Sequence, residues 1–299
     1  MKDNKIGERM GTKDITENYL EAYNDVFADI VNVLLFQGEK IIIPDQLTNA
    51  VSKAVYKADD GLHEEERDIS KYWSVGNIRI AIYGIENQTD IHPYMPLRLM
   101  GYDGASYREQ LLTGTPKEKY PVITLVLYYG TERPWDSPLA LSDCFNIPKK
   151  LTPYFSDYRI NVFNIAFLSD ETIGQFTSDF RIVADYFSQM RKNRDYKPST
   201  EQIVHVDAVL KMMSVMTGDD RFIEVQQMEK GEVHTMCEVM DRIEHKGQVE
   251  GQKSTLFRLV EKGKLDVTDA AQDAGLSNEE FLSQMESAGY KIPALVSYF

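Results

Sequence analysis

The sequence has few cysteines and no long apolar run. Its two cysteines, Cys144 and Cys237, stand without a CxxC pair or a Cys/His cluster, which argues against a zinc site and a disulfide framework. No stretch reaches the roughly 18 apolar residues of a membrane span, and residues 1–20 are charged and polar where a signal peptide needs an apolar segment. We therefore expect a cytoplasmic chain with no membrane partner.

Basic residues are outnumbered in this chain. There are 33 lysines and arginines against 47 aspartates and glutamates, which gives a formal net charge of −14. Such a balance argues against a broad basic surface that holds nucleic acid by counterion release alone. A local cationic rim and a bound metal ion can still offset an acidic centre. The candidate rim residues, each by itself also an ordinary solvated charge, are Arg98, Arg108, Lys149, Lys150, Arg191, Lys192 and Arg194.

A first helix is predicted over residues 16–36, where apolar side chains recur at helical spacing. Thr16 is the expected N-cap and Gly38 the expected stop. The following stretch, residues 40–67, is mixed and charged. It predicts a short helix followed by a loop.

A β-hairpin is predicted next. The segments RDISKYWSV and NIRIAIYGIENQ are two apolar runs joined by Ser-Val-Gly-Asn, which supplies turn chemistry. In the second strand, the period of two places alternate residues on one face. That face changes from apolar to polar at its end and comprises Ile78, Ile80, Ile82, Gly84, Glu86 and Gln88.

The segments after the hairpin complete an α/β pattern. Residues 95–112 predict a helix, YPVITLVLYYG is typical of a strand covered on both faces, and residues 160–168 predict another strand. Helix, hairpin, helix and buried strand together predict an α/β fold with a mixed sheet. From about Ser178 the spacing is helical, and the methionines of that region, Met212, Met213 and Met216, are expected to fill a core.

The last part of the chain is more polar. Residues 233–253 predict a helix, and residues 264–285 predict two short helices joined at Gly275, a pattern that resembles a helix-turn-helix. Its second helix carries Glu279 and Glu280 where a DNA-reading helix needs Arg, Asn or Gln. A small packing or oligomerisation element is the alternative interpretation.

Two carboxylates meet at one end of the predicted hairpin. Asp68 starts the first strand and Glu86 lies near the end of the second, so antiparallel pairing brings them together. Phosphodiester cleavage with a divalent cation requires such hard oxygen ligands at one point. Paired carboxylates repel each other unless a cation lies between them. Spacing alone does not separate this interpretation from an ordinary surface pair.

The hairpin motif also resembles a known signature. An Asp followed by Glu-x-Gln at the end of an apolar strand resembles the PD-(D/E)XK nuclease motif, with Gln in place of Lys. Over most of residues 17–245 the chain resembles the recombination-promoting nuclease and putative transposase family, through the segments YNDVFADIVNVLLF, ERDISKYW, GIENQTDIHPYMPLRLMGYDGASYREQL, YPVITLVLYYG and FRIVADYFSQMRKN. The resemblance implies a Mg²⁺-dependent (or Mn²⁺-dependent) DNA endonuclease linked to recombination or mobile elements.

The resemblance also implies an architecture. The expected fold is α/β and restriction-endonuclease-like, with a mixed β-sheet core flanked by helices and a helical C-terminal region. The nuclease core would span residues 1–177, a helical subdomain residues 178–245, and a small helical C-terminal element residues 246–299.

Site residues are implied by the same resemblance. Asp68 and Glu86 would be metal ligands, joined by the backbone carbonyl of Asn87. Gln88 would occupy the lysine position, where its neutral amide can hold a water or a phosphate oxygen but supplies no cation. The acidic residue of the first helix would be Asp25, with Asp29 as its rival one turn later.

Substrate contacts are expected on the following helix. Tyr107 and Gln110 lie three residues apart on a helix that runs beside the active centre in this fold, although a pair of half-exposed helix residues is the simpler interpretation. His92 precedes a proline, which is typical of a turn, and is left out of the catalytic set.

Three functional alternatives remain open from the sequence. The first is a DNA endonuclease; the second is a nuclease-derived module that binds DNA or a protein without turnover, suggested by the neutral Gln88 and the net charge. The third is an RNA substrate, for which no residue reads a 2′-hydroxyl. A homodimer is a reasonable expectation for double-strand cutting, with the polar helix near residues 238–252 as its interface.

Overall fold

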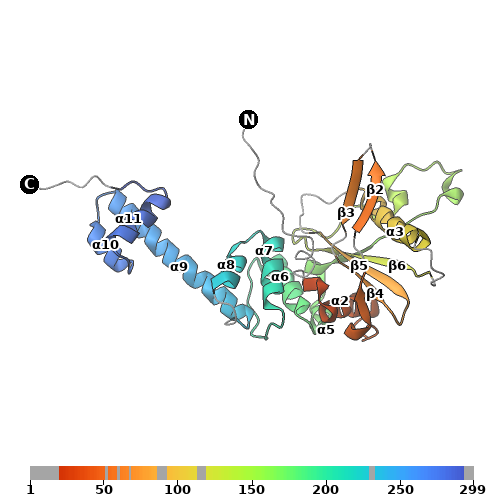
Figure 1. Ribbon diagram of the computed structural model, residues 1–299, viewed down its shortest axis with the longest axis horizontal. Coiled ribbons are helices and arrows are strands. Elements are labelled where there is room, and N and C mark those ends of the chain that lie inside the picture. The colour runs from red at the N-terminus through yellow and green to blue at the C-terminus, as the bar shows by residue number, and fades with distance from the viewer. Residues whose placement is uncertain are drawn as a thin grey trace, which may run out of the picture. The chain divides into compact units, whose positions relative to one another are not determined.

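The chain forms two compact units, residues 1–236 and residues 237–299. Each unit has its own cluster of buried apolar side chains. The structure is a computed structural model (Figure 1), and it describes residues 20–50, 53–58, 61–66, 69–85, 93–112, 119–228 and 233–292.

A five-stranded mixed sheet forms the centre of the first unit, in the order β1-β4-β5-β6-β7. β4 is antiparallel to both β1 and β5, whereas β5, β6 and β7 run parallel to one another. The predicted α/β fold with a mixed sheet is therefore confirmed. The strands of this sheet are β1 (Leu47–Asn49), β4 (Ile69–Trp73), β5 (Ile78–Ile85), β6 (Val122–Tyr128) and β7 (Asn161–Asn164).

The predicted hairpin is present as β4 and β5. Ile69 lies opposite Ile82, and Trp73 lies opposite Ile78. Ile80 and Ile82 are buried, as the period of two along this strand predicted.

The segment before β4 differs from the prediction. It contains three strands: β1 pairs with β4, while β2 (Lys53–Ala58) pairs with β3 (Gly61–Glu66) in a separate two-stranded sheet. The only helical piece described there is the 3₁₀ turn η2 (Pro44–Gln46). The predicted short helix is wrong because strand pairing, a tertiary interaction, satisfies the backbone of residues whose local pattern is ambiguous.

Helices lie on both faces of the sheet. On one face, the Phe27 ring of α2 lies 5.8 Å from the Lys71 ammonium of β4. On the other, Asp103 of α3 accepts a 2.8 Å hydrogen bond from the Thr124 hydroxyl of β6. The helices of the first unit are η1 (Leu20–Ala22), α2 (Asn24–Phe36), α3 (Met95–Leu112), α4 (Leu141–Cys144), η4 (Thr152–Tyr154), η5 (Ile165–Phe167), α5 (Asp170–Gln175), α6 (Phe180–Asn193), α7 (Val206–Thr217) and α8 (Arg221–Met228).

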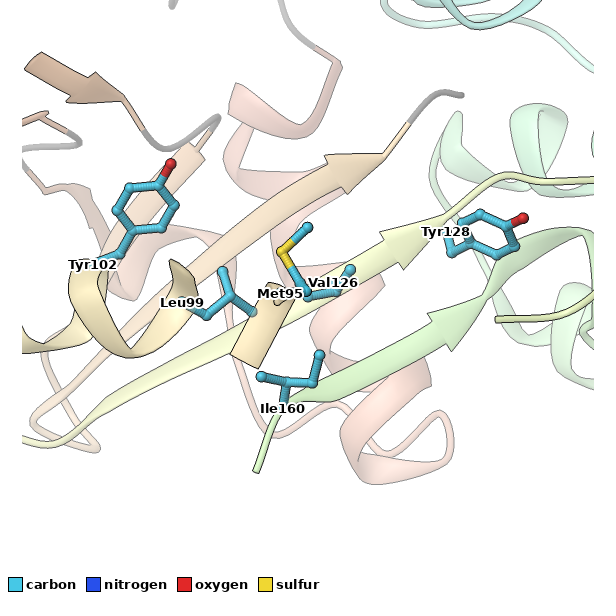
Figure 2. Close-up of a cluster of buried hydrophobic side chains, with 6 residues drawn as sticks. All are labelled: Met95, Leu99, Tyr102, Val126, Tyr128 and Ile160. Carbon is cyan, nitrogen blue, oxygen red and sulfur yellow. The ribbon is translucent and has the colours of Figure 1, made fainter. Parts of the chain in front are cut away.

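Under α3 the core is apolar and aromatic (Figure 2). Trp135, Tyr158 and Val162 pack around this cluster. Burial of large side chains of this kind contributes roughly 1.5–3 kcal/mol each, so α3 is firmly fixed on the sheet. The buried members are Met95, Leu99, Tyr102, Val126, Tyr128 and Ile160.

The helices after the sheet follow the predicted spacing. α6 coincides with the predicted segment 180–193, and Met212 and Met213 of α7 are buried core residues. The predicted strand over residues 160–168 is only half correct, because β7 ends at Asn164 and the chain continues as η5.

The second unit is helical. The long helix α9 (Met236–Glu261) leads into it, followed by α10 (Val267–Asp273) and α11 (Asn278–Ser287). Gly275 joins the two short helices with a positive φ of 68°. Ser277 and Glu280 form a reciprocal capping box at the start of α11. Across the described part of the chain, no helix combines the length and apolar character that crossing a membrane requires.

Candidate active site

β5, β6 and β7 end together at one edge of the sheet, the carboxyl edge. Ile85, Tyr128 and Asn164 are in register there. β4 begins at the same edge, because its first residue, Ile69, lies opposite Ile82 near the end of β5. The antiparallel pair thus brings the start of β4 toward the end of β5, with Ile85 three residues, or about 10 Å, beyond the position opposite Ile69.

The predicted catalytic residues adjoin these strand ends in the sequence. Asp68 directly precedes Ile69, and Glu86 directly follows Ile85. Asp68, Glu86, Asn87 and Gln88 themselves lie outside the described residues, as do His92 and the expected N-cap Thr16. Their roles therefore stay predictions.

A buried carboxylate, Glu21, lies at the carboxyl edge and was not singled out from the sequence. Glu21 is only 6% exposed, and its Oε1 lies 3.4 Å from the Tyr129 hydroxyl, which donates to it. Tyr129 directly follows β6 and is itself buried against Phe187 of α6. The sequence signal for Glu21 was present but weak: it is a charged residue one turn before α2, beside the apolar Leu20.

Asp25 has a different partner. Its Oδ2 lies 2.9 Å from Nε2 of His205, and its side chain is about half exposed, at 51%. The His205 ring also stacks on Tyr23, with ring centroids 3.8 Å apart. Asp25 thus links the start of α2 to the start of α7.

Asp29, the rival of Asp25, binds the start of another helix. Its carboxylate accepts hydrogen bonds of 2.7–3.0 Å from the backbone N–H groups and hydroxyls of both Thr177 and Ser178. These two residues immediately precede α6. The side chain therefore satisfies polar groups at a helix entrance, as N-terminal capping carboxylates do.

Asp25 and Asp29 also line a hollow of about 250 Å³ between α2, the loop that follows it and the chain from Gln175 to Ser178. Lys40, Gln175 and Thr177 complete its polar wall. Glu21 does not line this hollow. The carboxylates predicted on the first helix and the buried carboxylate at the carboxyl edge therefore face different surroundings.

Tyr107 and Gln110 lie at the opposite end of the sheet, the amino edge, where β5 and β6 begin at Ile78 and Val122. The Gln110 amide donates to the Tyr120 carbonyl at 3.0 Å, and its oxygen accepts from the Tyr120 N–H at 2.9 Å. The Tyr107 hydroxyl accepts from the Val122 N–H. Six residues of strand separate Val122 from Tyr128, which is about 20 Å, so the structure does not bring this pair to the carboxyl edge.

Lys71 is a buried lysine in the sheet. It is 1% exposed, and its ammonium donates to Asn49 Oδ1 at 2.7 Å. Burial lowers the pKa of Lys71 to about 8. Lys71 lies opposite Ile80, and Ile85 is five residues farther along β5, about 16 Å away. Lys71 therefore cannot supply the cation that Gln88 lacks at the carboxyl edge.

Within the described ranges, no three His, Cys, Asp or Glu side chains are grouped so that they could hold a metal ion. Among the described residues at the carboxyl edge, Glu21 offers carboxylate oxygens, and the sequence predicts two further carboxylates there, Asp68 and Glu86. Mg²⁺ and Mn²⁺ prefer carboxylate and carbonyl oxygens. The chemistry of this donor set fits such an ion.

Comparison with known proteins gives one finding. No curated protein and no solved structure matches the chain. The matched segment of the family model starts in the β4–β5 turn and ends in α7, so it contains β5, α3, β6, β7 and α6. Over residues 75–215 the chain matches the family described as "Putative transposase, YhgA-like", which confirms the family resemblance that the sequence motifs indicated.

Proposed function

We propose that the protein is a metal-dependent DNA endonuclease whose centre lies at the carboxyl edge of the sheet. The observation that carries the proposal is the β4–β5 register. It places Ile69, which follows Asp68, and Ile85, which precedes Glu86, toward the same end of the hairpin. The matched family supports a role with mobile DNA elements. Asp68, Glu86 and the carbonyl of Asn87 are the proposed ligands of Mg²⁺ or Mn²⁺.

The arrangement of elements supports a restriction-endonuclease-like core. In chain order the central elements are a helix, three antiparallel strands, a crossover helix and a parallel strand: α2, β1, β4, β5, α3 and β6. α2 and α3 cover opposite faces of the sheet, as the contacts of Phe27 and Asp103 indicate. This is the layer order expected for a sheet whose strand ends carry catalytic carboxylates.

We also propose Glu21, in place of Asp25, as the acidic residue contributed by the first helical segment. Ile85 pairs with Tyr128, so the next residues along the two strands are Glu86 and Tyr129. Tyr129 is the residue that holds Glu21. Asp25 and Asp29 are engaged elsewhere, by His205 and by Thr177 and Ser178. Glu21 is thus the carboxylate of this segment that lies nearest the proposed centre.

The proposed chemistry is hydrolysis of a phosphodiester bond. A divalent cation, when bound, offsets charge on the phosphate and lowers the pKa of water. The carboxylates of Asp68 and Glu86 would fix the position of the phosphate through that cation, and the Gln88 amide would orient the attacking water by hydrogen bonding. Burial keeps the Glu21 carboxylate away from bulk water. Its electrostatic interactions are stronger in this buried environment than they would be in water.

A binding module without turnover is the second candidate. The observation that favours it is the absence of a cation at the lysine position: Gln88 is neutral, and the register rules out Lys71 as a substitute. A module of this kind would bind DNA in EDTA as well as in Mg²⁺ and would leave it intact.

Plasmid nicking separates the two candidates. Purified protein is incubated with supercoiled plasmid in Mg²⁺, Mn²⁺ or EDTA, beside the Asp68→Ala and Glu86→Ala variants. We expect metal-dependent nicking by the parent and a loss of at least about 100-fold in both variants. Mg²⁺ binding, measured by calorimetry, should weaken in the same variants.

The matched control is Asp29→Asn, which alters a carboxylate of the same segment outside the proposed centre. It should cut at the parental rate per folded molecule. A folded parent that leaves plasmid intact in both metals would favour the binding module, and equal cutting by Glu86→Ala would remove the proposed site. Matched DNA and RNA strands decide the substrate class.

A further inference from the structure

An arm projects from the first unit between β6 and β7. It comprises residues 139–160 and is the yellow-green segment beyond α3 at the upper right of Figure 1. Its two legs pair with each other: the Leu141 N–H donates to the Tyr158 carbonyl, and the Ile160 N–H donates to the Leu139 carbonyl, at 3.0 and 2.9 Å. The arm is thus a defined hairpin-like element, which fixes where its tip lies.

The legs are anchored to the sheet and to α3. The Tyr158 hydroxyl donates to Asp103 at 2.6 Å, and Asp103 in turn binds Thr124 of β6. Farther out, the backbone N–H and the hydroxyl of Ser142 both donate to Asp157. These bonds stabilise the base of the arm without involving its tip.

The tip of the arm is exposed despite its apolar side chains. From residue 142 to residue 159 no residue is buried. Tyr154 is 85% exposed and Leu151 is 56% exposed. Consecutive turns hold this region in shape: Leu151 N–H donates to the Pro148 carbonyl and Tyr154 N–H donates to the Leu151 carbonyl. An aromatic ring held out to solvent on an ordered turn buries little area in the fold, so its face is available to a partner.

The charge of the tip contrasts with that of the chain. Residues 144–156 contain Lys149 and Lys150 and no acidic residue, although the whole chain carries a net charge of −14. Both lysines are exposed. A local positive charge on an acidic protein matches an anionic partner.

The arm begins next to the proposed centre. Before its first leg, the Trp135 N–H donates to the Asn164 side chain, and the Trp135 ring packs edge-on against Tyr128, at the carboxyl edge. On its first helix, the Cys144 thiol lies 3.8 Å from the Pro93 carbonyl. Pro93 is only five positions after Gln88 in the sequence. The arm therefore contacts Pro93, the first described residue after the proposed catalytic motif.

We propose that the arm binds single-stranded DNA next to the cutting centre, with Tyr154 stacking on an unpaired base and Lys149 and Lys150 contacting phosphates. The combination of an exposed aromatic face and nearby cations is the chemistry that single-strand binding uses. An acidic protein would match the lysines but gives no role to the free ring face. The inference rests on the proposed function, because it places the substrate of that same centre.

The test is binding of a fluorescently labelled oligothymidine to the full-length protein in EDTA, followed by anisotropy across a salt series. Tyr154→Ala should weaken binding roughly 5- to 100-fold without changing the salt dependence, and Tyr154→Phe should restore it. Lys149→Gln with Lys150→Gln should reduce the slope of log affinity against log salt by about 1.4. Lys262→Gln with Lys264→Gln, two exposed lysines of the second unit, is the charge-matched control and should change neither.

The outcomes separate the arm from the proposed activity. Normal oligothymidine binding with unchanged affinity and slope in all arm variants overturns the inference, while plasmid nicking can still stand. Arm-dependent binding without any nicking supports the inference and removes the nuclease. Poly-glutamate binding that the two lysine substitutions abolish, with DNA binding unaffected, would assign the arm to an acidic protein and overturn the inference. No oligothymidine binding by the parent overturns the inference, and plasmid nicking then decides the proposed nuclease separately.

Discussion

The two edges of the sheet differ in one buried polar group: Arg79 at the amino edge is paired, whereas the Tyr128 hydroxyl at the carboxyl edge has no partner among the described residues. Arg79, 3% exposed, donates to Ser70 at 2.8 Å and pairs with Glu109 at 3.2 Å. At the carboxyl edge, the Tyr129 hydroxyl donates to Glu21 at 3.4 Å. The Tyr128 hydroxyl is buried there without a partner among the described residues.

This contrast separates a structural edge from a candidate functional one. Buried polar groups are normally paired, so the Tyr128 hydroxyl calls for an explanation, and a functional role at this edge is one. Burial raises the pKa of Tyr128, so its hydroxyl stays neutral at physiological pH. We therefore expect mutations at the amino edge to lower stability and mutations at the carboxyl edge to lower the proposed activity.

Glu21→Gln gives the largest expected effect at the carboxyl edge. The amide keeps the size of the side chain but removes the charge, so nicking should fall about 100-fold. Because a buried charge is removed and not exposed, the free energy of unfolding should not decrease. Plasmid nicking and chemical denaturation measure the two quantities. A variant that cuts normally would show that Glu21 is an ordinary buried residue.

Lys71→Met tests the middle of the sheet. The depressed pKa of Lys71, about 8 against 10.5 in the unfolded chain, costs about 3 kcal/mol of stability below pH 8. The variant avoids this cost but loses the hydrogen bond from Lys71 to Asn49. Its free energy of unfolding should therefore be about 2 kcal/mol higher than that of the parent.

The sign of the pH dependence follows from proton binding. Between pH 8 and 10.5 the unfolded parent binds the proton that the folded parent releases, so parental stability attributable to Lys71 rises over this window. The advantage of the variant should therefore shrink from pH 8 to 10.5 in denaturation curves. Nicking should persist; its loss in a folded variant would mean that Lys71 acts at the centre despite the register.

Gln110→Ala tests the amino edge. Its removal leaves the N–H and the carbonyl of Tyr120 without their partner, which should cost about 1.5 kcal/mol of stability. Denaturant midpoints measure this cost. Nicking per folded molecule should be unchanged, and a selective fall in nicking would restore Gln110 as a substrate contact.

Asp25→Asn gives the smallest expected effect. The pair with His205 is about half exposed on the carboxylate side, and exposed pairs of this kind contribute less than about 1 kcal/mol. Thermal unfolding should shift only slightly, and nicking should be retained. A large loss of nicking would favour Asp25 over Glu21 as the acidic residue of the first helical segment.

Periodicity predicted the elements that are long and strongly patterned. The segments 95–112 and 180–193 form helices with those bounds, since their apolar spacing specifies one face toward a core. The same reasoning failed before β4, where Leu47 enters the sheet by pairing with Trp73. That pairing depends on a residue far along the chain, and no local pattern records it.

The acidic residues of the first helical segment show the same limit for the candidate site. By spacing, Asp25 and Asp29 are equivalent, and Glu21 is merely another carboxylate. Distances decide between them: Asp29 caps the entrance to α6, Asp25 meets His205, and Glu21 reaches Tyr129 at the end of β6. Each partner is more than 100 positions away, so only the folded chain assigns these roles.

The sequence by itself determined the α/β class, the β4–β5 hairpin and the resemblance to a transposase family, because side-chain periodicity and a short motif are local properties. The tertiary structure alone decided which edge of the sheet holds a buried carboxylate, that Lys71 lies too far along β4 to serve that edge, and that a basic, aromatic arm stands beside it. These features depend on strand register and on contacts between distant segments, which set distances that composition and spacing do not contain.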